Sequence, residues 1–155
     1  MNAFAGPSVR GASRFGWRRD PLRLVRDEGY VYVDVRSVME FDDGHPEGAY
    51  NVPLLDAGPG GMAPNPDFVA VMEAVFAKDT KLVLGCKAGG RSLKAAGMLA
   101  SVGFVELIDQ RAGFHGQVDP FGRAVEPGWL AKGLPTSKAP VEGRAYADLR
   151  KKAGR

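Results

Sequence analysis

The chain has 155 residues, of which 45% are hydrophobic and 25% charged, a balance typical of one globular domain with a single core. Its apolar runs are too short to span a membrane, and a lone cysteine excludes an internal disulfide framework or a CxxC metal or redox pair. The net charge is +3, but it is unevenly distributed. Residues 20–140 hold 12 Lys plus Arg and 16 Asp plus Glu, whereas residues 1–19 and 141–155 together hold 9 Lys plus Arg and 2 Asp plus Glu. Basic tails are thus favoured over a nucleic-acid surface, and we expect binding to neither nucleic acid nor membrane.

The first 19 residues carry four arginines and no acidic residue. This composition is typical of a flexible basic arm, and equally of an organelle transit peptide. The arm lacks the apolar stretch of a secretory signal, and a single cysteine suits a reducing compartment. We therefore expect a cytoplasmic protein, with a mitochondrial or chloroplast location as the alternative.

Short helices and strands alternate between residues 20 and 108. Helix-start signals occur where Asp20 precedes Pro21 and where Ser37 and Glu40 stand three apart as a capping box. Apolar spacing predicts helices over 21–28, 37–44, 66–75 and 91–102. It predicts strands over 30–35, 49–52, 81–85 and 104–108. Turn residues predict a turn over 45–48 and a loop over 56–66. Strands that are apolar throughout and alternate with helices indicate a parallel sheet covered on both faces. We expect an α/β fold with three layers: helix, sheet and helix.

Beyond residue 108 the pattern is irregular. Glycine and proline recur through residues 109–136, yet Phe114, Phe121 and Trp129 need cover, so we expect this segment to wrap around the domain. The expected organisation is a basic flexible N-terminal arm (1–19), one domain (20–136) and a charged C-terminal tail (137–155) with at most a short helix.

The chain's only cysteine, Cys86, stands between an apolar run and a helix-forming segment, separated from Arg91 by a glycine-bearing loop. A loop that enters a helix directs several backbone N–H groups at one point, where the helix dipole adds positive charge. We therefore expect the thiolate of Cys86 to be favoured. A lone cysteine is more often a small buried hydrophobe, but the flanking glycines and cations favour a reactive thiol. Residues 34–36 also end a strand, so they should share one edge of the sheet with Cys86.

Several motifs, in order, resemble the single-domain rhodanese family. They are Asp34-Val35-Arg36, Glu40-Phe41, Gly44-His45, the run from Gly48 to Pro53, and the loop Cys86-x-x-Gly89-x-Arg91-Ser92. The resemblance covers roughly residues 20–136, and the ordered set is far more specific than any one motif. Two departures are visible. The basic residues 14–19 are a weak candidate for the family's usual first strand, and Arg111-Ala112-Gly113 replaces the glycine pair after the last strand.

This resemblance implies a sulfurtransferase with a rhodanese-like fold and a mostly parallel sheet of about five strands. Cys86 would attack the sulfane sulfur of thiosulfate or a similar donor, release sulfite and hold the sulfur as a persulfide, which cyanide or a cellular thiol would then remove. The residues it implies for substrate binding are Lys87, Ala88, Gly89, Gly90, Arg91 and Ser92. Asp34, Arg36 and Glu40 would support the loop through a buried ion pair and hydrogen bonds. We expect no metal, and no cofactor beyond the transient persulfide.

Alternatives to a free-standing enzyme use the same loop. A sulfur carrier or regulatory module would hand the persulfide sulfur to a protein partner. A thiol phosphatase or arsenate reductase also places a cysteine before an arginine at a helix start, but with five residues between them, whereas four lie between Cys86 and Arg91. His45 is interpreted as a turn residue, and the sequence identifies no partner for His115. We expect a monomer or a weak dimer.

Overall fold

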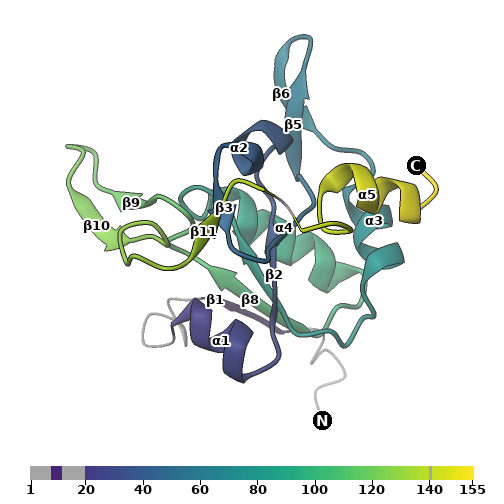
Figure 1. Ribbon diagram of the computed structural model, residues 1–155, viewed down its shortest axis with the longest axis horizontal. Coiled ribbons are helices and arrows are strands. Elements are labelled where there is room, and N and C mark those ends of the chain that lie inside the picture. The colour runs from purple at the N-terminus through teal and green to yellow at the C-terminus, as the bar shows by residue number, and fades with distance from the viewer. Residues whose placement is uncertain (1–7, 12–19, 140) are drawn as a thin grey trace.

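A five-stranded parallel sheet lies at the centre of the computed structural model, which describes residues 8–11, 20–139 and 141–155 (Figure 1). Across the sheet the strands follow the order β1 (Ser8–Gly11), β8 (Glu106–Gln110), β7 (Leu82–Gly85), β2 (Val31–Asp34) and β4 (Tyr50–Asn51). Every neighbouring pair in this order is parallel. The predicted α/β class, with a mostly parallel sheet of about five strands, is confirmed.

Helices cover both faces of this sheet. They are α1 (Pro21–Asp27), α2 (Val38–Asp43), α3 (Phe68–Val75), α4 (Gly90–Ser101) and α5 (Tyr146–Lys152). Successive residues of a strand face opposite sides. In β7, Leu82 and Leu84 therefore join one buried cluster with residues of α3, α4 and α5, whereas Val83 joins another with Leu24 of α1 and Phe41 of α2. Burial on both sides explains why the strand is apolar at successive positions.

The outer strand β1 lies within the segment that we expected to be a flexible arm. It pairs in parallel with β8, from Ser8 opposite Glu106 to Gly11 opposite Asp109. The first strand that the resemblance implies is thus provided by residues 8–11. The remainder of the expected arm lies outside the described residues.

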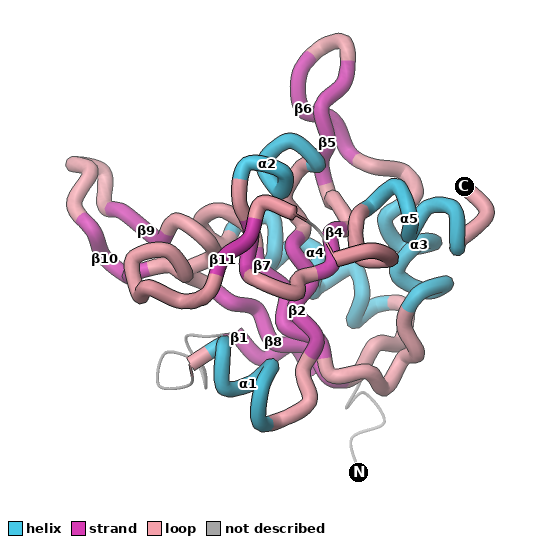
Figure 2. Tube along the Cα trace, viewed as in Figure 1, coloured by secondary structure: helices cyan, strands magenta, loops and turns pink. Residues whose placement is uncertain are grey.

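Three small antiparallel pairs lie outside the central sheet (Figure 2). They are β5 (Leu55–Gly58) with β6 (Gly61–Pro64), β9 (Gly116–Val118) with β10 (Ala124–Pro127), and β3 (His45–Pro46) with β11 (Thr136–Ser137). Figure 2 shows the first two projecting from the body. The expected loop over 56–66 and turn over 45–48 are therefore partly paired. Phe121, expected to need cover, is 82% exposed in the β9–β10 turn, while Phe114 and Trp129 are buried.

The C-terminal helix α5 packs beside α3, as Figure 1 shows. Tyr146 and Leu149 are buried in the same cluster as α3, and the hydroxyl of Tyr146 accepts a hydrogen bond from the amide of Asn65 at 2.8 Å. Of the two alternatives expected at this end of the chain, a short charged helix or a frayed tail, the structure has the helix, and it is packed because two apolar residues three apart cover α3. No helix of the described segments is long and apolar enough to cross a membrane.

Candidate active site

Cys86 lies directly beyond the carboxyl end of β7, in the loop that leads into α4. Its side chain is buried. The sulfur accepts hydrogen bonds from the backbone N–H of Gly89 at 3.1 Å and of Ser92 at 3.4 Å. Both donors belong to the start of α4, where the helix dipole adds partial positive charge. This arrangement stabilises negative charge on the sulfur.

The tight curl of the loop depends on Gly89. Its φ of +106° lies in the left-handed region, and a Cβ there would stand 2.3 Å from the carbonyl oxygen of Arg111. A Cβ on Gly90 would meet nothing within 4 Å. Of the two glycines in the loop around the sulfur, the geometry requires a glycine at position 89 and leaves space for a side chain at position 90.

Ser92 connects the sulfur to a buried carboxylate. Its Oγ lies 3.4 Å from Sγ of Cys86 and 2.6 Å from Oδ1 of Asp109. The carbonyl oxygen of Gly89 is a third neighbour, at 3.0 Å. Ser92, which we expected to bind substrate, is fully buried beneath the sulfur.

Asp109 is a member of the site that the sequence analysis did not identify. It lies near the carboxyl end of β8 and pairs in register with Leu84 of β7, so it shares the sheet edge with Cys86. Burial raises the pKa of Asp109 to about 6, although the hydrogen bond from Ser92 opposes this shift. An acidic residue near the end of a predicted strand was the available signal.

Arg91 joins the loop to α2. Its two terminal nitrogens donate to the two carboxylate oxygens of Glu40, at 2.7 and 3.0 Å. Glu40 also completes the capping box at Ser37 that the sequence predicts. The hydrogen bond from Arg91 is the main cause that lowers the pKa of Glu40 to about 2. Both ends of the guanidinium group are therefore engaged by a protein carboxylate.

Asp34 and Arg36 form an ion pair at 2.7 Å, and both side chains are 2% exposed. The guanidinium group lies over the ring of Phe114, 4.4 Å from its centroid. Arg36 also donates to the carbonyl of Gly44 at 2.6 Å. The expected buried pair is present, but this further hydrogen bond of Arg36 goes to the end of α2 rather than to the cysteine loop.

Residues 113–115 form a wall along the cysteine loop. The N–H of Phe114 donates to the carbonyl of Cys86 at 2.7 Å, and the N–H of His115 donates to the carbonyl of Lys87 at 3.0 Å. Two successive carbonyls of the loop are thus held from the same side.

Gly113 and Gln117 complete this wall. A Cβ on Gly113 would stand 2.4 Å from the carbonyl oxygen of Cys86, so the close approach requires a glycine here. The side-chain amide of Gln117 donates to the carbonyl of Ala88 at 3.2 Å. The close approach therefore falls on Gly113 of the run Arg111-Ala112-Gly113. The sequence analysis missed Gln117 because no local pattern marks a residue that contacts a loop so distant in the chain.

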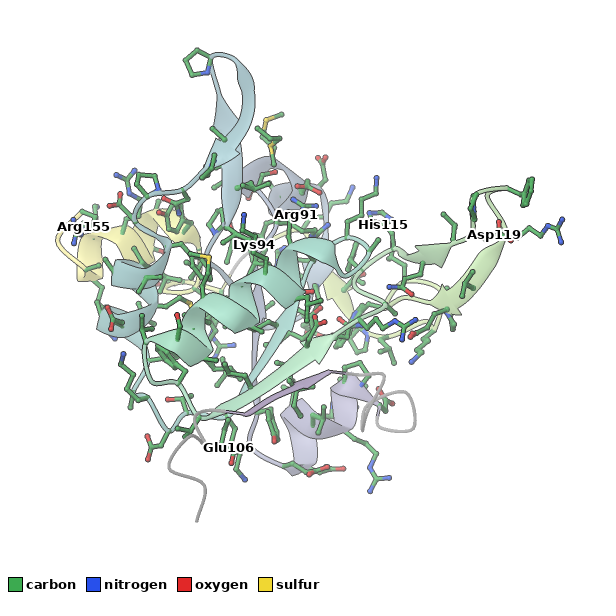
Figure 3. All side chains as sticks on the ribbon, turned by 180° about the vertical axis from the view of Figure 1, so that it is seen from behind. Arg91, Lys94, Glu106, His115, Asp119 and Arg155 are labelled. Carbon is green, nitrogen blue, oxygen red and sulfur yellow. The ribbon has the colours of Figure 1, made fainter. Side chains whose placement is uncertain are left out.

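A pocket of about 470 Å³ opens beside the loop. Its lining includes Arg36, Glu40, Asp43, Lys87, His115 and Lys138. Figure 3 shows His115 between the start of α4, where Arg91 lies, and the hairpin that carries Asp119. Burial, followed by the positive charges of Arg36 and Lys87, lowers the pKa of His115. Basic and acidic side chains thus line this pocket together, with Lys87 adjoining Cys86 in the chain.

His45 is not the turn residue that we expected. It is buried in β3, its ring stacks on that of Phe41 with the centroids 3.6 Å apart, and its Nδ1 lies 2.7 Å from the carbonyl of Phe41. Within the part of the chain that the structure describes, no group of three or more His, Cys, Asp or Glu side chains is placed to hold a metal ion.

A parallel α/β sheet with one cysteine in a tight loop at the start of a helix defines a class of small proteins that hold a thiol against backbone N–H groups at one sheet edge. A family model described as "Rhodanese-like domain" matches residues 21–117. The chain belongs to the rhodanese-like domain family, as the motifs of the sequence indicate.

Individual relatives agree with this assignment. The chain is 37% identical to thiosulfate sulfurtransferase 16, chloroplastic, of Arabidopsis thaliana over an alignment of 108 residues. That alignment covers 70% of this chain and 80% of the relative. It is also 37% identical to senescence-associated protein DIN1 of Raphanus sativus over an alignment of 97 residues. That alignment covers 61% of this chain and 53% of DIN1, so the chain spans about half of the length of DIN1. The crystal structure of Rv0390 from M. tuberculosis superposes with a TM-score of 0.65 at 24% identity, covering 86% of this chain and 99% of that one, and supports the fold.

Proposed function

We propose that this protein is a sulfurtransferase that carries sulfur on Cys86. The thiolate attacks the outer sulfur of thiosulfate or a similar anionic donor, the sulfur–sulfur bond of the donor breaks, and sulfite leaves with its electron pair. A nucleophilic acceptor then takes the outer sulfur from the persulfide and returns Cys86 to the thiolate. The relative named thiosulfate sulfurtransferase 16 supports this choice of donor.

The observation that carries the proposal is the pair of backbone donors on the sulfur. The N–H groups of Gly89 and Ser92 point at Sγ from the start of α4, and they stabilise the thiolate both before attack and after the acceptor has taken the sulfur. Lys87, exposed in the pocket beside Cys86, supplies positive charge for an anionic donor.

The state of Arg91 argues against phosphoryl or arsenate chemistry. A cysteine phosphatase needs the arginine of its loop free to bind a tetrahedral oxyanion. Here both terminal nitrogens of Arg91 are hydrogen-bonded to Glu40, and only four residues separate Arg91 from Cys86. A small loop that encloses one sulfur atom fits sulfur transfer better.

The acceptor is either a small nucleophile, such as cyanide or a cellular thiol, or a thiol of a protein partner. Both use the same persulfide, so they differ in turnover rather than in loading. A free-standing enzyme releases sulfite continuously when thiosulfate and a small thiol are supplied together, whereas a carrier stays loaded until its partner is added. The pocket beside Lys87 is open enough for a small thiol, which favours the enzyme.

Mass spectrometry of the intact protein tests the proposal. After exposure to thiosulfate the wild type should gain the mass of one sulfur atom and lose it when cyanide is added. Cys86→Ser should gain nothing. Turnover of a phosphate ester or of arsenate by a protein that takes up no sulfur would rule the proposal out in favour of a thiol phosphatase or arsenate reductase.

The cytoplasmic location expected from the lone cysteine stays a prediction. The names of relatives from Arabidopsis thaliana, which include "chloroplastic" and "mitochondrial", support an organellar location as the second candidate. A fluorescent fusion at the C-terminus, with Arg10, Arg14, Arg18 and Arg19 intact or replaced by glutamine, distinguishes the two. An organellar signal that is lost on replacement would favour the second.

A further inference from the structure

Ser92 places one hydroxyl group between the sulfur of Cys86 and the carboxylate of Asp109. The distances from its Oγ are 3.4 Å to Sγ and 2.6 Å to Oδ1 of Asp109. All three residues are buried, so bulk water does not compete for these contacts. The three groups form a continuous path for a proton from the sulfur to the end of β8.

The hydroxyl of Ser92 has a single proton to donate. When Asp109 is a carboxylate, the hydroxyl of Ser92 donates its proton to Oδ1, and Ser92 presents only lone pairs to the sulfur, which favours the thiol over the thiolate. When Asp109 is protonated, it donates to Ser92, and the hydroxyl proton can turn to a thiolate, with the carbonyl oxygen of Gly89 as its other acceptor. The two arrangements contain the same number of protons and differ in where they lie.

The surroundings make Asp109 a suitable proton acceptor. Burial raises the pKa of its carboxyl to about 6, closer to that of an ordinary thiol, with Glu126 of β10 adding to the shift and Arg111 opposing it. On the side of β1, the residue in register with Asp109 is Gly11, which has no side chain.

Other charged and titratable groups lie on the elements next to the sulfur. Tyr32 of β2 and Arg91 of α4 interact electrostatically with Cys86, Asp34 of β2 acts on both of these groups, and Lys87 follows Cys86 in the loop. None of them lies in the hydrogen-bonded path through Ser92, and none is substituted in the variants described below.

We propose that Asp109 receives the proton of the Cys86 thiol through Ser92 when the thiolate forms. The S–H bond breaks and its electron pair stays on the sulfur. The thiol proton passes to Oγ of Ser92, and the hydroxyl proton of Ser92 passes to Oδ1 of Asp109. Asp109 reaches the sulfur only through Ser92 and is therefore a positioning residue. The inference rests on the proposed function in taking Cys86 as the nucleophile, and it adds the destination of the proton.

The rate at which iodoacetamide alkylates Cys86, measured from about pH 5 to about pH 10, tests this inference. Cys86 is the only cysteine, so the mass of the protein reports this site alone. Two groups that share a proton titrate in two steps. The wild type should show two rises in rate separated by a plateau, the first near the pKa of Asp109. Asp109→Asn and Ser92→Ala should each show a single rise.

Ser92→Ala separates proton transfer from simple repulsion, because it keeps the charge of Asp109 while breaking the path. Two rises in this variant, or a single rise in the wild type, would overturn the inference. Asp109→Asn alters the far end of the path and Ser92→Ala its middle, and thermal unfolding identifies any variant that does not fold. Sulfur loading from thiosulfate is measured on the same samples. Loading with a single alkylation step contradicts the relay, and two steps without loading contradict the sulfurtransferase but not the relay.

Discussion

The guanidinium group of Arg91 and the carboxylate of Glu40 meet through two hydrogen bonds that join the cysteine loop to α2. Since Arg91 lies in the first turn of α4, this pair fixes the turn whose N–H groups surround Sγ of Cys86. The position of α2 and the shape of the loop are therefore coupled.

Glu40→Gln should lower the free energy of unfolding by about 1 kcal/mol near neutral pH, a modest value because the pair is partly exposed and screened by solvent. The pKa of Glu40 is lowered from 4.5 to about 2. The contribution of the pair is therefore complete above about pH 4.5 and disappears as the pH falls through about 2. Urea unfolding at a series of pH values should show the wild type and the variant converging in acid. A difference that does not change with pH would contradict this assignment.

Gly89→Ala and Gly90→Ala form a matched pair that tests the loop geometry. Alanine at position 89 meets the Arg111 carbonyl and takes a positive φ, so we expect a loss of about 2 kcal/mol or more in unfolding free energy and slower sulfur loading. Alanine at position 90 has open space and should leave both nearly unchanged. Thermal unfolding and the loading rate measure the two effects. Equal losses in the two variants would mean that the loop is not held as described.

Lys87→Gln tests whether the pocket attracts an anionic donor. We expect the KM for thiosulfate to rise by about fivefold with little change in kcat, and the difference to shrink as salt is added. Lys94→Gln is the control, because Lys94 is exposed on α4, where Figure 3 labels it, and is not among the residues that line the pocket. Steady-state sulfite release gives both constants. An equal rise in KM for the control would indicate a general effect of net charge.

Asp34→Asn should destabilise the protein by about 3 kcal/mol, because it leaves the buried guanidinium of Arg36 without its counter-charge. Combining it with Arg36→Met removes the unpaired charge and should recover much of that loss. Denaturant unfolding of the two single variants and the double variant completes the cycle. Additive losses would show that the two side chains do not act as a pair.

Local signals in the sequence predicted the elements that depend on neighbouring residues. Asp20 caps α1 with Pro21 at its start, and Ser37 and Glu40 form the expected capping box. The helix α3 begins at Phe68, two residues later than predicted. The side chain of Asn65 does not cap this helix; it accepts a hydrogen bond from the N–H of Asp67 in the turn that precedes it. The start of α3 therefore depends on the geometry of that turn.

Long-range pairing produced the features that the sequence did not predict. Residues 8–11 and His45–Pro46 become strands because distant segments, β8 and β11, offer unpaired backbone groups. Of the site, the cysteine loop could be located from its own residues. For Asp109 the sequence offered only its position at the end of a predicted strand, because its role depends on its placement beside β7 and on contact with Ser92.

The strand β1 restricts where the chain can be processed. Ser8–Gly11 occupies one side of β8, the strand that carries Asp109. Cleavage of residues 1–19 as a whole would turn β8 into an open edge, ready to pair with the strands of other molecules, which is a route to aggregation. A cleavage site that spares the sheet therefore lies before Ser8.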